Sequence, residues 1–164
     1  MTTTSTLNWK KPLLGCSFKL FSGETEVGKL KDSEFSRSAF GSLNDQSLKF
    51  TSKGHLHPRT EIRDLNSNEI VGEISFSSWY PKAKIEYKGQ VAFWKFSNLW
   101  ETRWGLSNNQ GLKLAFRGHA HKGSVKLNEA NDALVLAGLY VSNYYWRLTA
   151  VLIACILPLF LFAS

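Results

Sequence analysis

The feature that most constrains the fold is an apolar run near the end of the sequence, from Leu148 to Ala163, which contains no charged residue. As an α-helix rising about 1.5 Å per residue, this run is roughly 24 Å long, which is shorter than the ~30 Å hydrocarbon core of a membrane. Extending it back to Asn143 adds length only by including polar residues and Arg147. The run therefore forms either a helix buried inside the fold or a helix that enters a membrane.

The residues before this run carry the signals of short β-strands. Apolar side chains alternate with polar or small ones, as in Leu112, Leu114 and Phe116, which are separated by Lys113 and Ala115. Turn-forming residues separate these segments, and "DLNSNE" and "YKGQ" have the composition of hairpin turns. No segment before residue 141 shows a 3.6-residue apolar period. The predicted strands are 15–21, 25–31, 37–43, 47–52, 59–65, 69–76, 83–88, 90–96, 100–106, 111–117, 122–128 and 133–141.

About twelve strands predict a barrel too wide to be filled by the strand side chains alone. An α-helix with its side chains is about 10–12 Å across, and a helix that is hydrophobic all round is expected to be buried on every side. We therefore expect an all-β fold, an approximately twelve-stranded β-barrel that encloses a C-terminal hydrophobic helix at about 143–163. A membrane anchor is the alternative for this helix. Either interpretation rests on Arg147, Val151, Leu152, Ile153, Cys155, Leu157 and Phe160.

Length and composition indicate one globular domain. The 164 residues are 43% hydrophobic and 13% aromatic, which excludes a disordered chain. We expect a flexible lead-in over residues 1–12 and a single domain over 13–164. The two cysteines, Cys16 and Cys155, are too few for a disulfide framework and are expected to be buried thiols. The Thr-rich start "MTTTSTLNWKKPLLG" lacks the layout of a signal peptide, so secretion is not expected.

Two stretches of the sequence resemble a known family. "WRLTAVLIACILPLFLFAS", preceded by "ALVLAGLYVSNYY", is similar to the C-terminal end of phospholipid scramblases and, more broadly, to the tubby C-terminal and plant LURP-one-related fold. Arg147 followed by the aliphatic run from Ala150 to Cys155 matches the family pattern, and "EIRDLNSNEIVGEISF" resembles its strand–turn–strand, with Asp64 and Gly72 placed in the family's style. The resemblance covers about residues 15–164 and implies a twelve-stranded barrel around a C-terminal hydrophobic helix.

The sequence departs from this family just before the helix. The animal scramblases have an acidic calcium-binding segment there, whereas "LNEANDALV" offers Glu129 and Asp132 alone. A calcium site takes six to eight oxygen ligands, so calcium-triggered lipid scrambling is not expected of this chain. Proline-rich and cysteine-rich N-terminal segments are missing as well.

The four histidines form two His-x-His pairs, in "GHLHP" and "GHAHK". On a strand, the two members of such a pair point to the same face, and two pairs supply four nitrogen ligands for zinc or another divalent metal. The alternative is that both pairs lie in turns, because each follows Gly and precedes Pro or Lys-Gly. This speculative metal site consists of His55, His57, His119 and His121.

A basic strand is the other candidate site. In "SSWYPKAKIEYKGQ", one strand face carries Lys82, Lys84, Glu86 and Lys88, and Trp79 and Tyr80 precede them. A basic face beside aromatic residues suits an anionic membrane surface. It would also suit single-stranded nucleic acid, or it is an ordinary solvated barrel exterior.

These observations predict a non-enzymatic domain that binds lipid or works at a membrane surface. G-x-S-x-G, P-loop and H-E-x-x-H motifs do not occur in the sequence, and no cofactor is expected. The net charge of +7 favours anionic partners, of which we expect anionic lipid rather than nucleic acid; a protein partner is not defined. The expected location is the cytoplasm, peripheral to or anchored in a membrane. The alternatives are a tail-anchored protein with a β-rich cytosolic interaction domain and a His-x-His metal-binding module.

Overall fold

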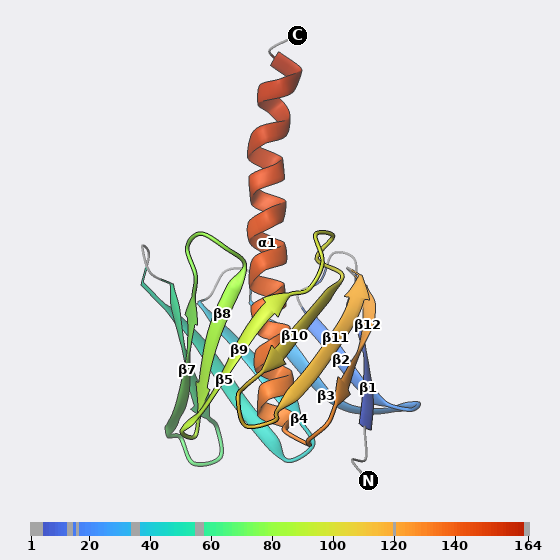
Figure 1. Ribbon diagram of the computed structural model, residues 1–164, viewed down its shortest axis with the longest axis vertical. Helices are drawn as coiled ribbons and strands as arrows, with labels where there is room; N and C mark the ends of the chain where they lie inside the picture. Colours follow the sequence, from blue (N-terminus) through green and yellow to red (C-terminus); the bar gives the residue numbers. More distant parts are fainter. Residues whose placement is uncertain are drawn as a thin grey trace.

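The computed structural model describes residues 5–12, 15, 17–33, 37–54, 58–119 and 121–162, with side chains described as far as Pro158. It is a closed antiparallel barrel of twelve strands with one helix, α1 (Asp132–Phe162), as the sequence predicts (Figure 1). Strands pair in chain order, and β1 closes the barrel between β12 and β2. The strands are β1 (Ser5–Lys10), β2 (Ser17–Ser22), β3 (Thr25–Asp32), β4 (Ser38–Leu43), β5 (Gln46–Lys53), β6 (Arg59–Asp64), β7 (Ile70–Phe76), β8 (Lys82–Tyr87), β9 (Gln90–Phe96), β10 (Arg103–Ser107), β11 (Lys113–His119) and β12 (Lys122–Leu127).

Two of the sequence-based assignments are wrong although the strand count is right. Residues 133–141, predicted as a strand, belong to α1, and residues 5–10, placed in the flexible lead-in, form β1. A continuous apolar run does not distinguish a buried strand from a buried helix by periodicity. Asn131 favours the helix here, because its Oδ1 accepts a hydrogen bond from the N–H of Leu134 at 3.1 Å and so caps the helix N-terminus. Asp132 adds a favourable negative charge in the first turn.

The predicted strand alternation is confirmed over most of the barrel. Leu114 and Phe116 on β11 point into the core, and Lys113 and Arg117 point to solvent. The "YKGQ" turn is a two-residue hairpin connection with positive φ at Lys88 (45°) and Gly89 (79°), the backbone that a type I′ turn requires.

A β-bulge interrupts the alternation on β7. The pairing of β6 with β7 shifts register between Ile62 and Arg63, which leaves one extra residue on β7 and turns Ile70 out to solvent. Gly72 lies at this bulge because a Cβ there would be 2.1 Å from the backbone oxygen of Glu86.

The first half of α1 fills the barrel. β1, β3, β5, β7, β9 and β11 run toward one end of the barrel, and the even-numbered strands run toward the other. α1 begins after β12 and passes through the interior to the end that the odd-numbered strands reach, which is called the exit end below (Figure 1). The helix residues that are buried inside the barrel are Ala133, Leu134, Val135, Leu136, Ala137, Leu139, Tyr140, Val141, Ser142, Asn143 and Tyr145.

Aromatic side chains position the helix within the barrel. Trp94 stacks on Tyr145 with ring centroids 5.3 Å apart, and its indole N–H donates to the carbonyl oxygen of Gly138 at 3.1 Å. Gly138 has no room for a side chain, since a Cβ there would be 2.6 Å from the ring of Phe116. The helix therefore has one close-packed position inside the barrel.

Candidate functional site

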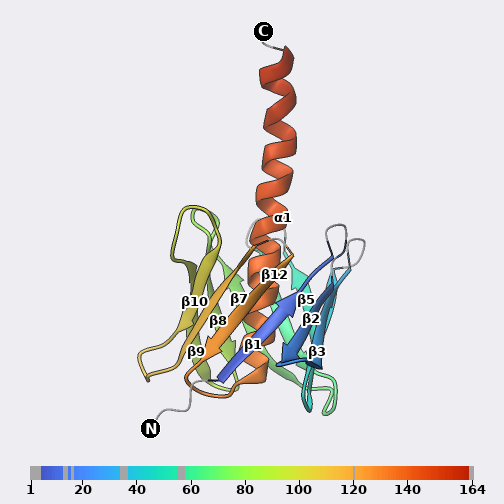
Figure 2. The same cartoon turned by 90° about the vertical axis from the view of Figure 1, so that its right-hand side faces the viewer.

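Beyond Arg147, the helix leaves the barrel and projects into solvent (Figure 2). The sequence-based expectation that Val151, Leu152, Ile153 and Leu157 are buried in the barrel is therefore wrong, and Ile153, for example, is 53% exposed. Cys155, expected to be a buried thiol, is also exposed. For Phe160, the structure describes the backbone alone, and Cys16 lies outside the described residues.

The reason is the depth of the barrel. Strands of six to eight residues are about 20–26 Å long, and a strand tilt of ~35–45° reduces this to roughly 15–20 Å along the barrel axis. The helix from Asp132 to Trp146 is already about 22 Å long. The interior is thus occupied before the most apolar segment begins. We call the projecting part of α1, from Leu148 onward, the helical extension.

Polar side chains surround the helix where it leaves the barrel. Asn143 accepts a hydrogen bond from Nζ of Lys11 at 2.7 Å and donates through Nδ2 to Asp32 at 2.7 Å. Arg147 donates to the same Asp32 oxygen at 2.9 Å. These four residues, the exit collar, fix the height at which the buried part of α1 ends.

The loop between β7 and β8 presents two aromatic side chains at the exit end. Trp79 is 89% exposed, and Tyr80 is exposed as well. The loop is held by the helix, because the hydroxyl of Tyr145 donates to the carbonyl oxygen of Lys82 at 2.6 Å. Burial raises the pKa of Tyr145 to about 12, so this donor keeps its proton at neutral pH.

The loop between β9 and β10 presents a second exposed apolar pair, Leu99 and Trp100, at 98% and 85% exposure. Hydrogen bonds stabilise the backbone of this loop, since Oδ1 of Asn98 accepts from the N–H groups of Thr102 and Arg103 at 3.1 and 2.9 Å. From the sequence, the tryptophans of "WKFSNLWETRW" are expected to be core or rim aromatic residues, and nothing in this stretch distinguishes the exposed Trp100 from the buried Trp94 and Trp104.

Glu101 connects this loop to the helix. Its backbone oxygen accepts from the indole N–H of Trp146 at 3.3 Å, and its carboxylate accepts from the hydroxyl of Thr149 at 3.4 Å. Partial burial raises the pKa of the Glu101 carboxyl, which the hydrogen bond from Thr149 offsets only in part. Both loops are thus fixed to α1, and their apolar side chains point away from the barrel.

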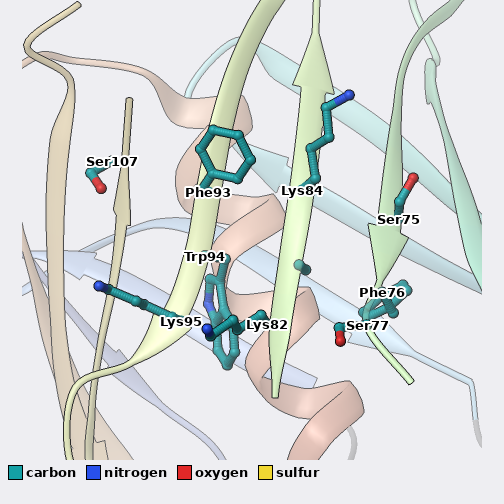
Figure 3. Close-up of a pocket in the computed structure, with 10 residues that line it drawn as sticks. Ser75, Phe76, Ser77, Lys82, Lys84, Phe93, Trp94, Lys95 and Ser107 are labelled. Atoms are coloured by element: carbon teal, nitrogen blue, oxygen red, sulfur yellow. The ribbon is translucent and has the colours of Figure 1, made fainter. Parts of the chain in front are cut away.

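The basic strand predicted from the sequence is β8, and its lysines do not form one patch. Lys82 and Lys84 line a groove of about 530 Å³ on the outside of β7–β10, where Lys84 lies opposite Phe93 and Lys82 opposite Lys95 (Figure 3). Lys84 forms an ion pair with Glu86. Lys88 is in the hairpin turn at the other end of the barrel, away from Trp79 and Tyr80.

Charge is distributed unevenly between the two ends of the barrel. In the turns and strand-terminal residues opposite the exit end, all of which the structure describes, the cations are Lys88 and Lys113, and the carboxylates are Glu24, Asp45, Asp64, Glu69 and Glu129. Among the described connections and strand-terminal residues on the exit side, the cations are Lys10, Lys11, Arg37, Lys53, Arg59, Lys82, Arg103 and Lys122, joined by Arg147 on the helix, and the carboxylates are Asp32 and Glu101. An anionic surface is therefore attracted to the end from which the helical extension projects.

The histidine pairs are only partly described. His119 ends β11 and His121 follows in the turn to β12, whereas His55 and His57 lie outside the described residues. Across the described part of the chain, no group of three or more His, Cys, Asp or Glu side chains is placed to hold a metal ion. The predicted four-histidine site stays a prediction.

Within the described residues, no helix combines the length and the apolarity needed to cross a membrane. Comparisons of this chain with protein-family models, with curated proteins and with solved structures give no match. The resemblance to scramblases and tubby-like proteins therefore stays a prediction, and function has to be inferred from the site itself.

Proposed function

We propose that this protein is a non-enzymatic domain that docks on an anionic membrane surface through its exit end. The observation that carries the proposal is the common position of three apolar elements: the helical extension, Trp79 with Tyr80, and Leu99 with Trp100. All of them are exposed and belong to the same end of one barrel.

The helical extension needs an apolar environment on every side. Its exposed aliphatic residues are Leu148, Val151, Leu152, Ile153, Ile156 and Leu157. They cover about two thirds of the helix circumference, and Ala150, Ala154 and Pro158 occupy the rest. A helix that packs against one protein partner needs an apolar stripe on one face only. Each aliphatic residue favours the hydrocarbon layer by about 0.3–0.6 kcal/mol, so the six residues together contribute about 2–4 kcal/mol.

The rim aromatics suit the boundary between hydrocarbon and headgroups. Tryptophan and tyrosine are enriched at this depth because their rings are apolar while the indole N–H and phenol O–H remain hydrated. The cations of the exit end then lie at headgroup level, where each contributes about 1 kcal/mol of attraction to an anionic leaflet. Phosphatidylserine is concentrated in the cytoplasmic leaflet, so we place the protein on that face.

Flotation with liposomes tests the proposal. We expect the full-length protein to float with phosphatidylserine-containing liposomes, and a chain truncated after Arg147 to lose most of this binding. Trp79→Ser combined with Trp100→Ser should weaken it several-fold. Ile70→Ser is the matched control, because Ile70 is an exposed apolar residue at the opposite end of the barrel. Folded full-length protein that does not float with any liposome would refute the proposal.

The alternative is a tail-anchored protein whose barrel binds another protein. In that case, the helical extension alone determines flotation, so the double tryptophan variant floats like the wild type. Binding to neutral phosphatidylcholine liposomes would also equal binding to anionic ones. A stable dimer in solution without liposome binding would instead indicate that the extension packs against a second copy of the chain.

A further inference from the structure

A second groove lies on the side of the barrel formed by β10, β11, β12 and β1. It has a volume of about 600 Å³ and opens next to the exit end, where β1 and β11 end and β10 and β12 begin. Its lining includes no carboxylate. The polar side chains that line this groove include Lys10, Arg103, Arg117, His119, Lys122 and Ser124.

The cations of this groove lie opposite one another on neighbouring strands. Arg103 on β10 is the cross-strand partner of Arg117 on β11. Lys122 on β12 is the partner of His119 on one side and of Lys10 on the other. Directly opposed side chains have their Cβ atoms about 4.5–5.5 Å apart, and like charges in such positions destabilise a sheet.

No carboxylate in the described part of the chain relieves this repulsion. On the other side of the barrel, several cations pair with neighbouring acids, as in the ion pairs Lys53–Glu61, Arg59–Glu73 and Lys84–Glu86. Among the described residues, none forms an ion pair with Lys10, Arg103, Arg117 or Lys122. The groove therefore retains a cluster of cations whose mutual repulsion a bound anion would relieve.

The part of the sheet beneath these cations, in β11 and β12, is rigid. Gly118 and Gly123 are cross-strand partners, and a Cβ at either position would be 2.3–2.4 Å from the ring of Trp9. Trp9 is thus packed directly under this part of β11 and β12. The cationic side chains project from a sheet that cannot move inward.

We propose that this groove binds a phosphomonoester group. Two adjacent guanidinium groups present planar pairs of N–H donors that match phosphate oxygens bidentately. Lys122 and the Ser124 hydroxyl supply further donors, and a dianion neutralises more of the cluster than a phosphodiester does. The source is either a lipid headgroup in the docked membrane or a free phosphate ester. If the source is a lipid headgroup, the inference rests on the proposed membrane docking; if the source is a free phosphate ester, it does not.

The test compares vesicles of phosphatidylcholine mixed with phosphatidic acid and vesicles mixed with phosphatidylserine at equal surface charge and fixed salt. We expect the full-length protein to bind the phosphatidic acid vesicles at least about five-fold more tightly. Arg103→Gln combined with Arg117→Gln should remove this preference while phosphatidylserine binding remains. Lys113→Gln combined with Lys126→Gln is the control, because it removes the same charge from β11 and β12 outside the groove.

Titration of the full-length protein with phenyl phosphate separates the two sources. Saturable binding that the double arginine variant loses supports the groove even if no vesicle binds, in which case only the proposed membrane docking fails. Equal affinity for both vesicle types, together with no saturable phenyl phosphate binding, would overturn the groove while leaving docking intact. Equal losses in the arginine variant and its control would also overturn it, because general charge would then account for the binding.

Discussion

Truncating the chain after Arg147 tests whether the helical extension contributes to folding. The sequence alone predicts that this deletion empties the barrel. The structure predicts that it barely changes stability, because the aliphatic residues of the extension are exposed. Its described hydrogen bonds to the barrel run from Thr149 to the Glu101 carboxylate, at 3.4 and 3.5 Å. Such long bonds contribute about 1 kcal/mol or less, which corresponds to a Tm change of at most about 4 °C for a domain of this size.

Leu136→Ala provides the contrast within the same helix. Leu136 is fully buried, and its methyl groups lie close to Gly41 of β4, at 3.2 Å from the position of a Cβ there. Truncating a buried leucine costs about 2–5 kcal/mol. Urea denaturation followed by circular dichroism measures both variants. An insoluble truncated chain, or a loss above about 3 kcal/mol from the truncation, would refute the division of α1 into a buried half and a projecting half.

Two further predictions concern the barrel. Burial raises the pKa of Tyr145 to about 12 in the folded protein, against ~10 in an unfolded chain. The folded protein therefore gains stability from the protonated phenol, and this gain is complete below pH 10 and is lost as the pH rises through 12. The advantage of the wild type over Tyr145→Phe should therefore fall by about 2–3 kcal/mol across this window, and a constant difference in urea denaturation would contradict it. Gly72→Ala should cost at least about 2 kcal/mol in thermal unfolding, because the new Cβ meets the backbone oxygen of Glu86; unchanged stability would mean that the bulge relaxes.

The fold was largely predictable from the sequence because its signals are local. Alternation identified most strands, and the Lys88–Gly89 turn has the residues that its backbone needs. The error at 133–141 arose because a continuous apolar run suits a buried strand and a buried helix equally. The error at 5–10 arose because Trp9 is the one fully buried residue of β1, so the strand shows little alternation.

The candidate site was less predictable because it depends on pairing between distant strands. Trp79, Tyr80 and Lys82 are close in sequence, and they do lie together at the exit end. The groove on the other side unites Lys10 with Lys122 and Arg103 with Arg117, and these contacts follow from strand register. A single sequence contains the charges but not their register. It therefore directs attention to β8, where Lys84 is already neutralised by Glu86.

The exit collar explains why α1 stops where it does. The helix is apolar on both sides of the collar, so hydrophobic burial alone does not choose which segment occupies the barrel. Asn143 and Arg147 determine which segment lies inside, because both bind Asp32 at the exit end. Moving the helix inward by one turn, about 5.4 Å, would carry Arg147 to the fully buried position of Asn143, beside the like charge of Lys11, where a guanidinium group is costly to desolvate. The polar residues therefore set the register, as a buried asparagine does in a coiled coil, and this register is what leaves the most apolar segment outside the barrel.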